Sequence, residues 1–194
     1  MKTITRPVAG VLLLFAASCT KSPLATPQPA AESADNSALA VTHFVGEHFG
    51  GGIVFYVNSA GTHGLIADTV DLVPATWYNG TYTITGVTDV ALGTGKPNTR
   101  AVIQSQGTAG SYAAIECAKS RHSGFKDWFL PSLDELHELY LKQNIFGNFV
   151  QNYYWCSSEI HDSSVFSWGI YFYSGVEYAN PKNIVGNVRA VRQF

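Results

Sequence analysis

Carboxylates that could serve as general acids or bases gather in the run Asp127–Leu136, which reads Asp-Trp-Phe-Leu-Pro-Ser-Leu-Asp-Glu-Leu. Ser132 and Glu135 in this run have the S-x-x-E spacing of a capping box, in which each side chain binds a backbone N–H of the other residue. We therefore interpret Glu135 as the cap of a helix that starts near Leu133, not as a catalytic acid. The large apolar residues of the run are expected in the core: Trp128, Leu130 and Leu136.

Three other motifs are weaker candidates for chemistry. His137–Leu141 lacks the second histidine of a zinc-protease helix, and Gly93–Pro97 lacks the spacing and the Ser or Thr of a phosphate-binding loop. His161 and Asp162 pair a base with an acid, but we interpret them as a solvated turn because adjacent side chains rarely point the same way. The sequence thus predicts no catalytic site, no metal centre and no cofactor, and we expect that the protein is not an enzyme.

Cys117 and Cys156 are the two cysteines beyond the N-terminal region. In an oxidising compartment such a pair often forms a disulfide, which here would close a loop of about 40 residues. The bond would link a helix-like segment to a strand-like one. The other interpretation is two separate buried thiols, each packing as a small apolar residue. The sequence leaves both interpretations open.

The first 18 residues have the order of a secretory signal peptide. Lys2 and Arg6 supply positive charge, and Val8–Ala17 is an apolar stretch shorter than the roughly 20 residues that span a bilayer. Small residues then precede Cys19, an order that resembles a bacterial lipobox. We predict a lipoprotein signal peptide at 1–18 and lipidation of Cys19. The alternative is an ordinary signal peptide with an incidental cysteine.

The rest of the chain divides into a tether and one domain. Residues 19–43 are rich in Pro, Ala, Ser and Thr and are expected to be flexible. This arrangement predicts an envelope protein that is lipid-anchored to the outer membrane, on its periplasmic side or exposed at the surface. Residues 44–194 are long enough to bury a core. The formal charge of −2 and the lack of a basic stripe argue against a nucleic-acid partner.

Hydrophobic periodicity predicts an α+β domain with two main helices. Charged residues make up only 13% of the chain, and aromatic residues are as frequent, which suits a loop-rich domain with a β core. Helices are expected at 99–106, 111–121 and 133–143, and strands at 52–57, 63–67, 77–78, 149–158, 165–174, 176–178 and 185–194.

The predicted strand 165–174 alternates two sets of side chains. One set is expected to be core: Phe166, Trp168, Ile170 and Phe172. Tyr171 and Tyr173 belong to the other set, and either lie on a solvent face where they could stack on a ligand or pack under a neighbouring loop.

A series of short motifs, in this order, resembles a known family. The motifs are Gly51–Tyr56, Trp77–Gly80, Gly93–Gly95 with Asn98–Thr99, Trp128–Leu136, Tyr154–Glu159 and Val188–Arg192. Together they resemble the C-terminal domain family of the Legionella collagen-like adhesin, long catalogued as a domain of unknown function. Cys156 replaces the serine that is usual in the Tyr-Trp-Ser-Ser motif of this family.

This resemblance implies a C-type-lectin-like fold, with two helices flanking antiparallel sheets, long loops and chain ends that lie close together. The adhesin member of the family binds sulfated polysaccharides and is trimeric through its collagen-like region. The present chain has no Gly-X-Y repeat, so the trimer does not carry over. The Glu-Pro-Asn and Trp-Asn-Asp signatures of calcium-dependent lectins are also missing from the sequence.

The sequence and the resemblance together predict a binding module for an extracellular glycan or surface protein, with a role in adhesion or recognition. Its contact with the membrane would be through the lipid anchor only. The alternatives are a structural or assembly lipoprotein that binds no sugar, and an enzyme whose site no motif announces. The residues predicted to contact the ligand are Glu159, His161, Asp162, Tyr171, Tyr173, Tyr178, Asn180 and Lys182.

Overall fold

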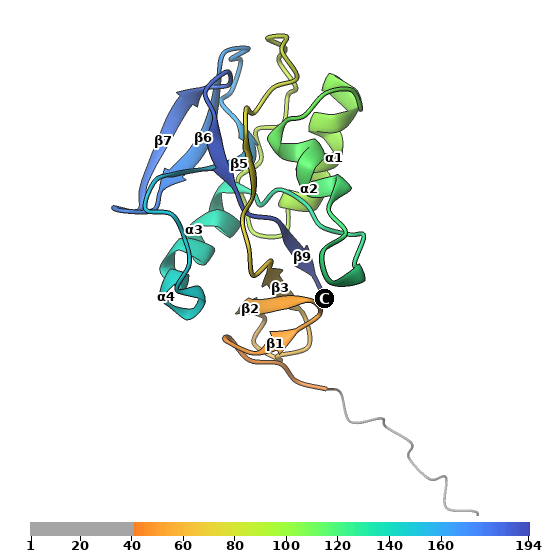
Figure 1. The fold of residues 1–194 in the computed structure, drawn as a ribbon, viewed down its shortest axis with the longest axis vertical. Helices are drawn as coiled ribbons and strands as arrows, with labels where there is room; N and C mark the ends of the chain where they lie inside the picture. Colours follow the sequence, from red (N-terminus) through yellow and green to blue (C-terminus); the bar gives the residue numbers. More distant parts are fainter. Residues whose placement is uncertain (1–40) are drawn as a thin grey trace, which may run out of the picture. The chain divides into compact units, whose positions relative to one another are not determined.

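The structure is a computed structural model that describes residues 41–194. The predicted signal peptide at 1–18, the predicted lipidation site Cys19 and the predicted tether as far as residue 40 lie outside the described residues. The described part is an α+β fold with four α-helices and two mostly antiparallel sheets (Figure 1). This confirms the predicted fold class at the level of α+β.

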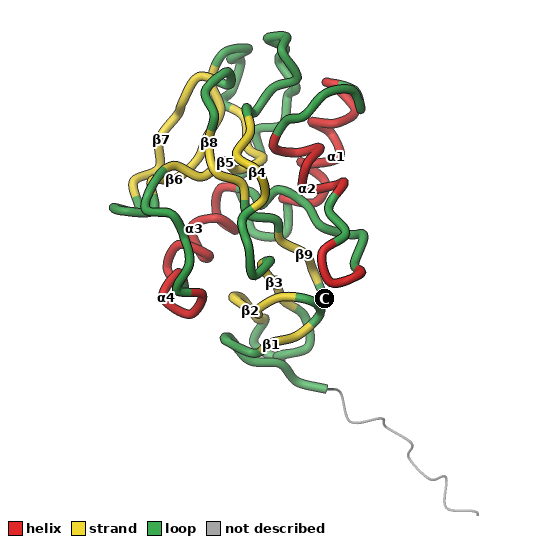
Figure 2. The backbone as a smooth tube through the Cα atoms, in the orientation of Figure 1, coloured by secondary structure: helices red, strands yellow, loops and turns green. Residues whose placement is uncertain are grey.

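The smaller sheet joins the two ends of the described segment. Its strands lie in the antiparallel order β1-β2-β3-β9, so the last strand of the chain pairs with the early hairpin (Figure 2). A bulge between Val54 and Tyr56 shifts the register of β2 against β3. The strands are β1 His48–Phe49, β2 Gly52–Val57, β3 Gly64–Ala67 and β9 Val191–Gln193.

The larger sheet has five strands in the order β4-β8-β5-β6-β7. Its pairs are antiparallel except for β5 and β8, which run parallel. Strand β7 therefore lies at an edge. The strands are β4 Leu72–Ala75, β5 Tyr153–Glu159, β6 Phe166–Tyr171, β7 Val176–Pro181 and β8 Gly186–Val188.

Strand β5 separates two hydrophobic cores because its successive side chains point to opposite faces. Tyr153 and Trp155 enter the core shared with α1 and α2, whereas Tyr154 and Cys156 enter the core shared with α3. Every residue of β5 is buried, as expected for a strand covered on both faces. The helices are α1 Gly95–Gln106, α2 Ala113–Lys119, α3 Leu133–Leu141 and α4 Gln143–Phe146, with a 3₁₀ turn, η1, at His122–Gly124.

The capping box predicted from the sequence is present. The Ser132 hydroxyl accepts from the Glu135 N–H at 3.3 Å, and the Glu135 carboxylate accepts from the Ser132 N–H at 3.0 Å. Both residues are buried, and so are the predicted core residues of this run. The interpretation of Glu135 as a capping group is confirmed.

Several predicted elements have different bounds in the structure. Residues 77–78 are not a strand, and the helix predicted from Thr99 starts at Gly95. The stretch 185–194 is two strands, because the chain passes from the larger sheet to the smaller one at Arg189–Ala190. Phe166, expected in the core, is 42% exposed because it lies at the end of β6 against edge strand β7.

Of the two interpretations of the cysteine pair, the structure supports the separate buried thiols. Cys117 and Cys156 are both buried free thiols, and they lie in the two different cores that β5 separates. The Cys156 Sγ atom lies 3.1 Å from the Trp168 carbonyl oxygen. Burial raises the pKa of Cys156 to about 12 and raises that of Cys117 well above its usual value. Both residues therefore act as small core residues.

We expect both thiols to be unreactive in the folded protein. A thiol reagent such as 5,5′-dithiobis(2-nitrobenzoate) should modify neither Cys117 nor Cys156 at pH 8, since the thiolate is the reactive form and both groups are buried. In denaturant without reductant both should react at once. Peptide mapping of the modified protein would check this, and a Cys117–Cys156 disulfide peptide would contradict it.

Candidate functional site

Glu159 and Lys182, which were predicted to contact a ligand, form a buried ion pair instead. The Glu159 carboxylate also accepts from the Thr85 N–H and the Gly86 N–H, each at 2.8 Å. The Lys182 ammonium group donates to the carbonyl of Thr83 at 2.9 Å. Both side chains are fully enclosed, so they hold the loops together and are removed from the candidate ligand site.

Asn180, His161 and Asp162 differ in what they can contribute. Asn180 is largely buried, and its amide donates to the Tyr171 hydroxyl at 3.3 Å, so it supports that tyrosine. His161 and Asp162 form an exposed turn in which the imidazole lies 2.9 Å from the carboxylate. Their exposure agrees with the solvated turn expected from the sequence, but the two adjacent side chains do meet, contrary to the reason given for that expectation.

The three predicted tyrosines share one face of the β6–β7 hairpin, which we call the tyrosine face. Tyr171 pairs with Val176, and Tyr178 pairs with Gly169, so these side chains point to the same side of the sheet. The ring of Tyr171 lies 5.4 Å from that of Tyr173 and 6.1 Å from that of Tyr178. Tyr173 is 65% exposed and Tyr178 is 53% exposed. Two exposed rings thus flank a half-buried third ring.

The opposite face of this hairpin carries a shallow apolar groove of about 470 Å³. Phe166 and Trp168 line it together with Ile160, which lies in the loop after β5. Tyr178, on edge strand β7, also contributes to its lining. The other lining residues are Glu177 and Ala179.

Basic side chains gather at a second place that the sequence analysis did not identify. Lys96, Arg100 and Lys126 line a pocket of about 240 Å³, whose walls include Trp128. Asp127 also lines it but is held by two hydrogen bonds from Arg192, at 2.9 and 3.0 Å. Burial acts to raise the pKa of Asp127, but the bonds and charge of Arg192 outweigh it, so this pKa is lowered. The pocket therefore presents an excess of positive charge.

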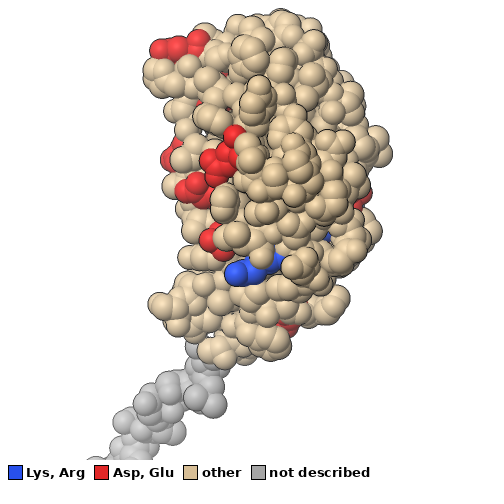
Figure 3. Space-filling model, turned by 90° about the vertical axis from the view of Figure 1, so that its left-hand side faces the viewer, with Lys and Arg blue, Asp and Glu red and all other residues tan. Residues whose placement is uncertain are grey.

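The opposite charge prevails on the face that β7 and α3 present. Figure 3 shows acidic side chains spread over this face and few basic ones. Asp134 on α3 and Glu177 on β7 are exposed acids of these two elements. The near-neutral net charge of the chain thus hides a separation of charge between faces, which sequence counting alone did not reveal.

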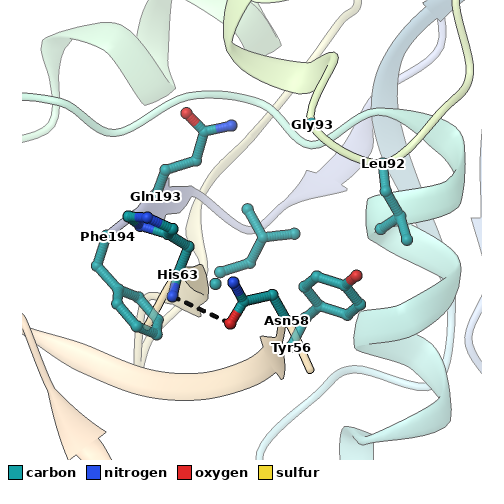
Figure 4. Close-up of a pocket in the computed structure, with 9 residues that line it drawn as sticks. Tyr56, Asn58, His63, Leu92, Gly93, Gln193 and Phe194 are labelled. Carbon is teal, nitrogen blue, oxygen red and sulfur yellow. Dashed lines mark hydrogen bonds between the residues drawn. The ribbon is translucent and has the colours of Figure 1, made fainter. Parts of the chain in front are cut away.

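A third pocket lies on the smaller sheet, with a volume of about 360 Å³ (Figure 4). Tyr56, Leu65 and Gln193 come from three adjacent strands, and Leu92 comes from the loop before α1. Sequence reasoning missed this pocket because its residues, from Tyr56 to Phe194, are up to 138 positions apart and meet only through the pairing of β2 with β3 and of β3 with β9. The remaining lining residues are Asn58, His63, Gly64, Gly93 and Phe194.

Comparison with known proteins adds no family assignment, since no protein-family model and no curated protein matches the chain. Within residues 41–194, no group of three or more His, Cys, Asp or Glu side chains is placed to hold a metal ion. No helix in the described part of the chain has the length and apolar character needed to cross a membrane.

Proposed function

We propose that residues 44–194 form a C-type-lectin-like domain of a lipoprotein anchored in the outer membrane, and that this domain binds an extracellular glycan through the tyrosine face. The exposed pair Tyr173 and Tyr178 is the observation that carries the proposal. An exposed aromatic ring offers an apolar face on which a sugar ring can stack, while its hydroxyl remains free for hydrogen bonds. The ordered motifs that resemble the collagen-like adhesin family support the same function.

Contacts beneath the tyrosine face hold it rigid, which favours the binding of a ligand. The hydroxyl of Tyr153 donates to the Tyr178 carbonyl at 3.0 Å, and its ring packs 5.0 Å from Tyr171. Asn180 fixes the Tyr171 hydroxyl from β7. Because these contacts hold the backbone and the central ring in place, little conformational entropy is lost when a ligand stacks on the outer rings.

We expect Tyr173→Ala to weaken binding of a glycan by roughly two- to tenfold, since an aromatic contact contributes about 0.5–1.5 kcal/mol. The protein would first be screened on an array of neutral, carboxylated and sulfated glycans. The dissociation constant for the glycan with the strongest signal would then be measured by calorimetry for the wild type and for Tyr173→Ala.

Tyr82→Ala is the matched control, because Tyr82 is 44% exposed but lies outside the tyrosine face. Unchanged binding in Tyr82→Ala with weakened binding in Tyr173→Ala supports the proposal. Equal affinities of wild type and Tyr173→Ala for a confirmed ligand would remove the tyrosine face as the site. A screen without any hit would favour the structural or assembly role instead.

A further inference from the structure

The pocket on the smaller sheet is built by one row of side chains across three strands. Tyr56 on β2 is the register partner of Leu65 on β3, and Leu65 is the partner of Gln193 on β9. Side chains at paired positions share a face of the sheet. The bulge between Val54 and Tyr56 re-aims Tyr56, as bulges commonly do beside binding sites. The row therefore forms one wall of the pocket.

The polar side chains of this pocket are available to a ligand. Figure 4 shows Gln193 and His63 on one side of the opening and Tyr56 and Leu92 on the other. Figure 4 marks the hydrogen bond that the His63 backbone N–H donates to the Asn58 side-chain oxygen, at 3.3 Å. Three polar side-chain groups make no hydrogen bond with any described group: the Tyr56 hydroxyl, the His63 ring and the Gln193 side-chain amide. A ligand can therefore use all three.

The apolar side chains give the pocket a second character. Leu65 is buried and Leu92 is 39% exposed. Phe194 also lines the space. Aromatic and aliphatic walls with a few convergent polar groups are typical of small-molecule sites, and about 360 Å³ lies near the small end of their usual range. The pocket thus suits a ligand of about one ring.

The lack of charged side chains in this pocket limits the class of ligand that it can bind. None of the nine lining residues is Lys, Arg, Asp or Glu, so a charged ligand would lose water without gaining a side-chain counter-charge. A purely apolar ligand would bury the Gln193 side-chain amide and the Tyr56 hydroxyl without hydrogen-bond partners, which is also unfavourable. A ligand with an apolar face and several hydroxyl groups satisfies both requirements.

We infer that this pocket binds a single neutral sugar ring, or a terminal neutral sugar of a longer glycan. The sugar ring would lie between Tyr56 and Gln193. Its hydroxyls would form hydrogen bonds with the Gln193 side-chain amide, the His63 imidazole and the Tyr56 phenol. This inference does not rest on the tyrosine face, which is built by the other sheet.

Amide chemical shifts of the ¹⁵N-labelled protein would test the inference. The probes are glucose, galactose and N-acetylglucosamine, with glucuronate and glucosamine as charged comparators. We expect at least one neutral sugar to shift the amides of Gly64, Gly93 and Gln193 in a saturable manner, with affinity on the order of millimolar. Absence of such shifts with all neutral probes, or equal affinity for a charged one, would overturn the inference.

Two substitutions separate the pocket from other surfaces. Gln193→Leu should weaken the neutral sugar roughly three- to tenfold through the loss of one hydrogen bond, whereas Gln104→Leu, an exposed amide on α1, should not. Leu92→Trp, at a half-exposed loop position, should block the pocket without disturbing a core. Tyr173→Ala should leave the shifts unchanged, so failure of the proposed function and failure of this inference are distinguishable. Retained affinity in both Gln193→Leu and Leu92→Trp would refute the pocket.

Discussion

Lys182→Met is expected to lower the free energy of unfolding by about 3–5 kcal/mol, the usual effect of breaking a buried ion pair by removing one partner. The substitution leaves the Glu159 carboxylate charged and enclosed, since neither side chain of the pair is exposed to solvent. It also frees the Thr83 and Ser163 carbonyls, which accept from the Lys182 ammonium group at 2.9 and 3.2 Å. The ammonium group further lies 4.8 Å from the centre of the Trp77 ring.

The effect should be large because this pair fastens two long loops. Glu159 at the end of β5 binds the segment that contains Thr85 and Gly86. Lys182 binds that segment and also the loop between β5 and β6. Burial lowers the pKa of Lys182, and the contact with Glu159 opposes this shift. The negative charge of Glu159 thus offsets part of the effect of burial on the lysine.

Urea unfolding followed by tryptophan fluorescence would measure this loss. Lys126→Met is the control, because Lys126 is exposed and lies in no ion pair of the described residues, so its change should stay within about 0.5 kcal/mol. A loss below about 1 kcal/mol for Lys182→Met would show that the enclosed pair does not hold the loops. Glu159→Gln should also lower the free energy of unfolding, since it leaves the Lys182 ammonium group enclosed without a counter-charge.

Glu135→Ala is expected to cost about 3 kcal/mol, because one buried carboxylate serves the starts of two helices. It accepts from the Ser132 N–H at 3.0 Å at the start of α3, and from the Gly93 N–H at 2.9 Å and the Gly95 N–H at 3.4 Å at the start of α1. A negative charge also stabilises both helix N-termini through their dipoles. The substitution would leave these buried donors without partners, each unfavourable by about 1–3 kcal/mol and not fully additive.

Thermal and urea unfolding would compare Glu135→Ala with Glu138→Ala, a half-buried glutamate on the same helix. The control should lose less than about 1 kcal/mol.

Burial raises the pKa of Glu135, although its three N–H donors oppose the rise. The folded state thus holds this proton more tightly than the unfolded chain, so the stability that is linked to protonation of Glu135 is fully present below about pH 4.5 and is lost as pH rises through the folded pKa. The hydrogen bonds that Glu135→Ala removes are a separate contribution to stability. Glu135→Gln should lack this pH dependence of the free energy of unfolding. If Glu135→Gln and the wild type had the same dependence on pH, the prediction would be wrong.

The predictions that held depend on contacts between residues close in sequence. The capping box needs only Ser132 and Glu135, three positions apart, so its spacing was sufficient to predict it. The two-residue period of a strand also predicted that Ile170 and Tyr171 lie on opposite faces, and in the structure they pack against the two different cores. The sequence could not show that Glu135 also binds Gly93 and Gly95, more than 35 positions away.

The predictions that failed depended on which distant segments would cover a residue. Glu159 and Lys182 stand in polar, loop-like contexts, and only the folding of residues 83–86 over them makes them a buried pair. Cys117 and Cys156 were compatible with a disulfide until β5 placed them in separate cores. Phe166 follows the core alternation of its strand but extends beyond the part of the sheet that is covered.

The sequence by itself determined the α+β class, the capped helix at Ser132 and the alternation of side chains along β6, because propensity, period and capping are local properties of the chain. Only the tertiary structure decided which polar groups are enclosed and which remain free to bind. Tyr56, Leu65 and Gln193 become one pocket wall because β9 returns to pair with β3, and no local pattern encodes that pairing. Burial and convergence are set by long-range strand pairing, and the candidate sites of this protein depend on both.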